Sequence, residues 1–183
     1  MTFLEFAAFI TGIVYLLGIS YSKRWAWFFG IGNAAAYVYI SVEYQLFIQA
    51  NLQGIYVFFG AYGFWAWGIE KHAHVQEWQL KKHLFATCIA AVLALVLGYQ
   101  VQEWTDQNMA YLDAFISVFA LLATYLTAHH ILENWYYWIG INLISIVLFS
   151  SQELYITAGM FLVNLGMSLW GLYQWKRQLS LEK

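Results

Sequence analysis

Seven apolar segments follow one another along this chain, with only short polar breaks between them. They lie at 3–21, 26–43, 46–68, 84–100, 109–128, 135–150 and 154–175. A membrane-spanning α-helix needs about 20 predominantly apolar residues, so each segment is close to the required length. No proline interrupts any of them, and only 10% of all residues are charged, against roughly 25% in a typical soluble domain. The sequence therefore predicts an all-α membrane protein with seven transmembrane helices.

The basic residues indicate how these helices cross the membrane, because they all fall on one side of the predicted bundle. They are Lys23, Arg24, Lys71, Lys81, Lys82, Lys176, Arg177 and Lys183. Loops that carry Lys and Arg stay in the cytoplasm. The N-terminus is therefore expected outside and the C-terminus in the cytoplasm, with the lipid bilayer around the helices.

An internal repeat relates the first three segments to the last three. A spacing of four, three and four residues occurs in the third segment, at Tyr56, Gly60, Gly63 and Trp67, and again in the seventh, at Asn164, Ser168, Gly171 and Trp175. The two units are offset by four helices, so they share one orientation and form a parallel repeat. We expect 1–69 to form the first three-helix repeat, 70–108 a cytoplasmic loop and linker helix, and 109–183 the second repeat with a short cytoplasmic tail. In carriers built this way the substrate lies near the repeat interface.

Candidate site residues lie on two helical faces. In the third segment, Gln53 and Tyr56 lie on one stripe with small residues. In the sixth, Trp135 and Trp138 lead inward to Asn142. Aromatic rings followed by hydrogen-bonding groups suit a flat, vitamin-like solute. The alternative is that the glycines only allow close helix packing and the tryptophans only anchor the helices at the membrane interface.

Three further polar residues complete the predicted set. Asn33 and Asn164 are amides within the second and seventh segments, and both belong to the sequence patterns that the two repeat units share. Asp113 is a carboxylate inside the fifth segment, about one turn from its outer end. An ionisable group inside a membrane is a candidate for function. As a site, Asp113 would face a cationic substrate or take a proton; as a surface residue, it would reach the lipid headgroups.

Several kinds of chemistry lack their motif. The chain has no G-x-x-x-x-G-K-[ST] loop for ATP, no G-x-S-x-G elbow and no H-E-x-x-H pair. His72 and His74 lack partners at metal-binding spacing, and Cys88 is the only cysteine. We therefore expect no enzymatic activity, cofactor, metal or nucleic-acid partner. No Lys or Arg lies in mid-membrane, which favours an uncharged or cationic solute over a phosphorylated one.

Two stretches of sequence resemble the PnuC family of vitamin transporters. One is NLQGIY at 51–56 leading into YGFWAW at 62–67, and the other is ENWYYWI at 133–139 leading into Asn142. The likeness extends from Trp25 to Trp175 and includes LDAF at 112–115. The paired tryptophans before Asn142 are its most specific part.

The resemblance implies a 3+1+3 arrangement of helices similar to the SWEET sugar transporters, and a homotrimer in the bacterial cytoplasmic (inner) membrane. It also implies facilitated diffusion of nicotinamide riboside, with thiamine or riboflavin as alternatives, and trapping of the vitamin by a cytoplasmic kinase. By the same resemblance Trp135, Trp138, Asn142 and Gln53 line the site. His129 and His130 stand where many members have Arg or Lys, so the inner gate is expected to differ. The alternative of another class is a non-transporting membrane subunit or enzyme.

Overall fold

Seven α-helices make up the computed structural model, which describes residues 3–43, 47–69, 74–104 and 109–182. They are α1 (Phe3–Ser20), α2 (Ala26–Glu43), α3 (Phe47–Ile69), α4 (Leu80–Trp104), α5 (Ala110–Ala128), α6 (Asn134–Ser151) and α7 (Tyr155–Glu182). The predicted number and order of helices are confirmed. Two helices extend beyond the apolar segments that predicted them: α4 begins before residue 84, and α7 continues through polar residues past 175.

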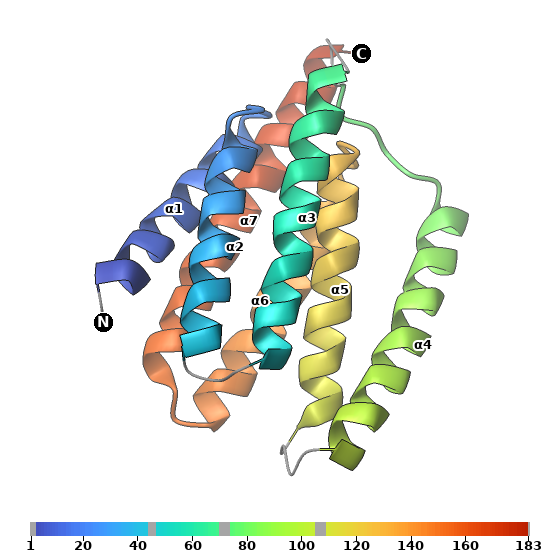
Figure 1. Cartoon of the computed structure of the whole chain (residues 1–183). Coiled ribbons are helices and arrows are strands. Elements are labelled where there is room, and N and C mark those ends of the chain that lie inside the picture. The colour runs from blue at the N-terminus through green and yellow to red at the C-terminus, as the bar shows by residue number, and fades with distance from the viewer. Residues whose placement is uncertain (1–2, 44–46, 70–73, 105–108, 183) are drawn as a thin grey trace.

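Six of the helices form a closed ring, and the seventh lies outside it (Figure 1). Each ring helix packs against its neighbours in the order α1, α2, α3, α5, α6, α7, and α7 returns to α1. Within the described residues, the helix packing of α4 is with α5 alone. Helix α4 therefore leaves the interior of the ring to the other six.

Three helices meet a test of length and mean hydropathy for membrane spans within the described residues: Leu80–Trp104, Ala110–Ala128 and Tyr155–Leu181. A shorter apolar stretch covers Ala7–Ser20 in α1. The helices α2, α3 and α6 contain Trp, Tyr, Asn, Gln and Gly, which lower mean hydropathy. Many of these side chains point into the ring, where a helix need not be apolar.

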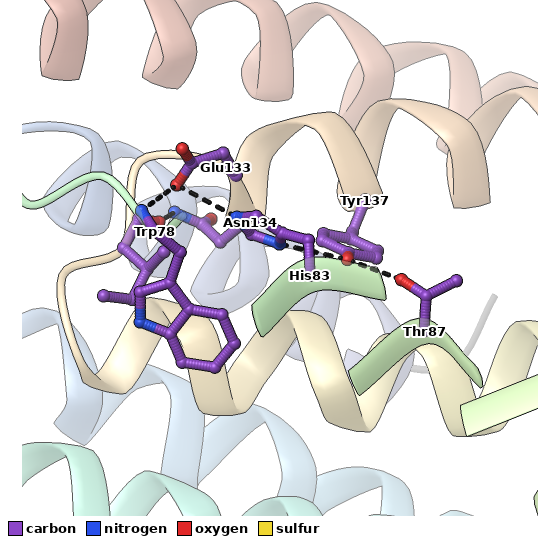
Figure 2. Close-up of polar contacts among 7 residues, drawn as sticks. Trp78, His83, Thr87, Glu133, Asn134 and Tyr137 are labelled. Atoms are coloured by element: carbon purple, nitrogen blue, oxygen red, sulfur yellow. Dashed lines mark hydrogen bonds and ion pairs between the residues drawn. The ribbon is translucent and has the colours of Figure 1, made fainter. Parts of the chain in front are cut away.

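A polar network fixes the start of α4 to the start of α6 (Figure 2). The Glu133 carboxylate accepts a hydrogen bond from the backbone N–H of Trp78 at 3.2 Å and lies 3.5 Å from Nε2 of His83. The Tyr137 hydroxyl bonds to Nδ1 of His83 at 3.2 Å and to the Thr87 hydroxyl at 2.9 Å. These contacts hold α4 against the ring at an end where it would otherwise touch only α5.

The strand-like segment before α4 is tied to the connection between α5 and α6 as well. The backbone N–H of Gln76 donates to the His130 carbonyl at 2.9 Å, and the N–H of Leu132 donates to the Gln76 carbonyl at 2.8 Å. Together with Glu133, this short bridge positions the residues that follow α5.

Tryptophan and glycine make the same contact twice in the ring. In the first three helices Trp27 packs over Gly63 and meets Trp67 edge to face, with ring centroids 5.4 Å apart. In the last three, Trp135 packs over Gly171 and meets Trp175 edge to face at 5.5 Å. Glycine is required at both positions because a Cβ there would overlap the indole ring.

Candidate functional site

A cavity of about 490 Å³ lies inside the ring of helices. Side chains from all six ring helices line it, and α4 contributes none. Six of the eight predicted site residues are in its wall: Asn33, Gln53, Tyr56, Trp138, Asn142 and Asn164. The volume is within the range of roughly 300–1,000 Å³ that small-molecule sites occupy. The structure thus brings together residues that the sequence places on four separate segments.

The other two predicted residues lie elsewhere. Trp135 is 1% exposed and packs over Gly171, behind the cavity wall. It precedes Trp138 by one helical turn, yet only Trp138 lines the cavity. Asp113 is in the first turn of α5, exposed at the surface of the chain and outside the cavity wall. Neither residue contacts the cavity directly.

Hydrogen bonds fix several of the polar side chains in the wall. Asn142 donates from Nδ2 to the Ser168 hydroxyl at 3.1 Å, and that hydroxyl donates to the Asn164 backbone carbonyl at 2.8 Å. Asn33 donates from Nδ2 to the Ala8 carbonyl on α1. An amide held through its nitrogen can still accept a hydrogen bond through its oxygen. These amides therefore offer a solute positioned acceptors.

Aromatic rings and neutral polar groups make up most of the rest of the wall. Tyr15 and Trp27 lie toward one end of the cavity, and Phe149 and Phe161 stack at a centroid distance of 5.2 Å near the other. No Lys, Arg, His, Asp or Glu of the described residues lines the cavity. A flat solute that is uncharged or cationic suits such a wall, because aromatic faces attract both rings and cations.

A tryptophan cluster closes the ring beyond Trp27, at the end where Lys23, Arg24 and Lys176 lie. Its members are Trp27, Trp67, Trp135, Trp175 and His130. Two of its indoles bond to the neighbouring helix of the ring: Trp67 Nε1 donates to the Ala128 carbonyl at 3.1 Å, and Trp175 Nε1 donates to the Ile19 carbonyl at 3.0 Å. Each bond joins a helix of one half of the ring to the end of a helix of the other half.

His130 lies between the rings of Trp67 and Trp175 in this cluster. The centroid distances are 4.1 Å and 5.7 Å, and both ring pairs are stacked. The side chain is 1% exposed, and neither ring nitrogen has a hydrogen-bond partner among the described residues. Burial, with a smaller contribution from neighbouring His129, lowers the pKa of His130 from 6.5 to about 4. The imidazole is therefore neutral at pH 7.

Sequence reasoning did not single out several residues of the wall, among them Tyr15, Trp27, Thr124 and Phe161. Tyr15 lies in a first segment that carries no polar stripe, and Thr124 is one of several hydroxyls in a mostly apolar helix. The sequence analysis noted Ser168 only as part of the repeated spacing and not as a site residue. The usable signal was the repeat itself, since Phe161 and Gln53 occupy matching places in α7 and α3.

Comparison with known proteins bears on what this cavity serves. Residues 2–177 match the family model described as nicotinamide mononucleotide transporter. The chain belongs to this family. It is 24% identical to the nicotinamide riboside transporter PnuC of Escherichia coli (strain K12), over 96% of this chain and 85% of that protein. It is also 24% identical to PnuC of Haemophilus influenzae, over 92% of this chain and 76% of the relative.

A solved structure shares the fold. The crystal structure of the vitamin B3 transporter PnuC superposes with a TM-score of 0.80 at 20% sequence identity, covering 98% of this chain and 83% of that one. The relatives are transporters, so family membership identifies the chain as a multi-pass membrane transport protein and excludes the enzyme alternative.

Proposed function

We propose that this protein carries nicotinamide riboside across the bacterial inner membrane by facilitated diffusion. The observation that carries the proposal is the neutral cavity at the centre of the ring, walled by Trp138 and by amides. The curated relatives are nicotinamide riboside transporters, which supports the same solute here. The chain has no ATP-binding motif that could power accumulation. A cytoplasmic kinase would instead keep the riboside inside, because the added phosphate meets no cation in the cavity wall.

The transport path in this proposal runs between two three-helix repeats joined by α4, in the SWEET-like 3+1+3 arrangement. The matched contacts of Trp27 with Gly63 and of Trp135 with Gly171 support it. In this proposal the tryptophan cluster lies on the cytoplasmic side and the N-terminus outside, which the side that carries the basic residues supports. The chain would be closed inward by that cluster, and a homotrimer would be its assembly.

The proposed contacts with the riboside come from the six predicted residues in the wall. Trp138 stacks on the cationic pyridinium ring. The ribose hydroxyls form hydrogen bonds with the four amides of the wall: Asn33, Gln53, Asn142 and Asn164. Tyr56 adds a phenol on the same wall. Trp135 acts from behind, by holding the helix that carries Trp138 against α7. Asp113 has no contact with the solute in this proposal.

Replacing Trp138 with Ala is expected to weaken riboside binding by roughly 1–3 kcal/mol, because an aromatic partner is lost from a desolvated pocket. Calorimetric titration of the purified protein would measure the change. Trp104, which is 82% exposed at the end of α4, provides the control. Equal affinity in Trp138→Ala and wild type, with both proteins folded, would remove Trp138 from the site.

Proteoliposomes test the function itself. Labelled nicotinamide riboside should enter without ATP until the inside and outside concentrations match. Unlabelled riboside should block this uptake, whereas the mononucleotide at equal concentration should not, because its phosphate would lose hydration without meeting a cation in the cavity wall. Equal inhibition by the mononucleotide would contradict the proposal. Thiamine also presents a cationic ring, and the same competition would show whether it is the preferred solute instead.

A further inference from the structure

Four pairs of matching positions in the two halves of the ring exchange an aromatic side chain for a small one or an amide. The contacts of Trp27, Gly63 and Trp67 recur at Trp135, Gly171 and Trp175, always 108 positions later. This register pairs Tyr15 with Ala123, Gly30 with Trp138, Gln53 with Phe161, and Tyr56 with Asn164. In each pair one residue is aromatic and the other is small or an amide. The two halves therefore share their tryptophan–glycine packing contacts but present different side chains to the cavity.

The pairs Tyr15 with Ala123 and Gly30 with Trp138 exchange large and small residues between neighbouring helices. In the first half, the ring comes from α1, and Tyr15 lies directly on the backbone of Gly30 in α2. A Cβ on Gly30 would be 2.8 Å from Cδ2 and 2.9 Å from Cε2 of that ring. In the second half, the ring comes from α6, and Trp138 packs on the buried cluster that contains Ala123 of α5.

From this exchange we propose that Gly30 determines which solutes fit, by setting how far the Tyr15 ring reaches into the cavity. Tyr15, Gly30 and Trp138 all line the cavity. On its other side Tyr15 meets Trp27 edge to face at 5.7 Å, so the ring has no room to retreat toward the tryptophan cluster. A side chain at Gly30 would push the ring into the open volume, where the heteroaromatic part of a solute lies.

The inference rests on the proposed function and is tested by binding. In Gly30→Ala we expect the affinity for nicotinamide riboside to fall by at least about tenfold, because the displaced ring occupies space that the solute needs. Gly32→Ala is the matched control on the same helix, since a Cβ there meets nothing within 4 Å. The double variant Gly30→Ala, Tyr15→Leu should recover affinity to within about threefold of the single variant Tyr15→Leu, because the coupled ring is gone.

A second measurement keeps the inference testable if Gly30→Ala does not fold. Tyr15→Leu alone should enlarge the cavity, so riboflavin, with its three fused rings, should compete for riboside binding more strongly than it does in wild type. Unchanged riboside affinity in Gly30→Ala, or no recovery in the double variant, would overturn the assignment; so would unchanged competition by riboflavin. A wild-type protein that binds none of these vitamins would instead refute the proposed function.

Discussion

Replacing Gly171 with Ala should destabilise the protein by about 1–3 kcal/mol, the usual cost of forcing an extra group into a packed interior. The new Cβ would overlap the six-membered ring of Trp135, which is 1% exposed. That indole cannot move easily, because Trp175 meets it edge to face from the same helix as the glycine. The midpoint of thermal unfolding in detergent would report the loss.

Gly166→Ala is the matched control for this experiment. Gly166 lies on the same helix, and a Cβ there meets nothing within 4 Å. Ala favours a helix over Gly by up to about 1 kcal/mol, so this variant should be neutral or slightly stabilised. Both variants gain this propensity, and only Gly171→Ala meets the indole. Equal unfolding midpoints for the two variants would contradict the prediction and show that the Trp135 indole can make room for a methyl group at position 171.

Acidification is the second change with a large expected effect. The pKa of His130 is about 4 in the folded protein and 6.5 in the unfolded chain. Because the folded state disfavours the charged imidazole, stability is full above pH 6.5 and falls as the pH drops toward 4. The whole loss corresponds to roughly 3 kcal/mol. Thermal unfolding of the purified protein between pH 7 and pH 4 would measure it.

Other groups titrate in the same range, so a variant must isolate the contribution of His130. His130→Phe keeps an aromatic ring between Trp67 and Trp175 and cannot be protonated. Its unfolding midpoint should fall less than that of wild type over the same pH range. A pH dependence that survives in His130→Phe would locate the sensitive group elsewhere.

The helices were predictable because a backbone in lipid must satisfy its own hydrogen bonds, which leaves long apolar segments few alternatives. Four residues of the cavity wall, Asn33, Gln53, Asn142 and Asn164, were predictable for a related reason: amides are costly in a membrane unless they face a cavity or a partner. The same reasoning marked polar faces on α3 and α6, and residues of both faces line the cavity.

Trp135 and Asp113 show where this reasoning stops. Trp135 and Trp138 share a helical stripe, but residues three apart are still offset around the helix, and only the packing of α7 decides which indole is covered. Asp113 is close enough to a helix end to face outward, which its sequence position could not settle. Tyr15 was missed because it enters the wall from α1 against Gly30 of α2, and a pattern within one segment contains no contact between helices.

The two crossed indole bonds have a consequence for leakage. The indole of Trp67 in the first half donates to the Ala128 carbonyl in the second, and the indole of Trp175 in the second half donates to the Ile19 carbonyl in the first. If the halves part at this end, both indole donors and the Ala128 carbonyl lose their partners, whereas the Ile19 carbonyl keeps the backbone N–H of Ser22. A buried unpaired group costs about 1–3 kcal/mol. The closed arrangement at this end is therefore favoured over one in which a gap admits water, protons or sodium. With this end closed, a cell could hold many copies of the protein in its membrane without dissipating its proton and sodium gradients.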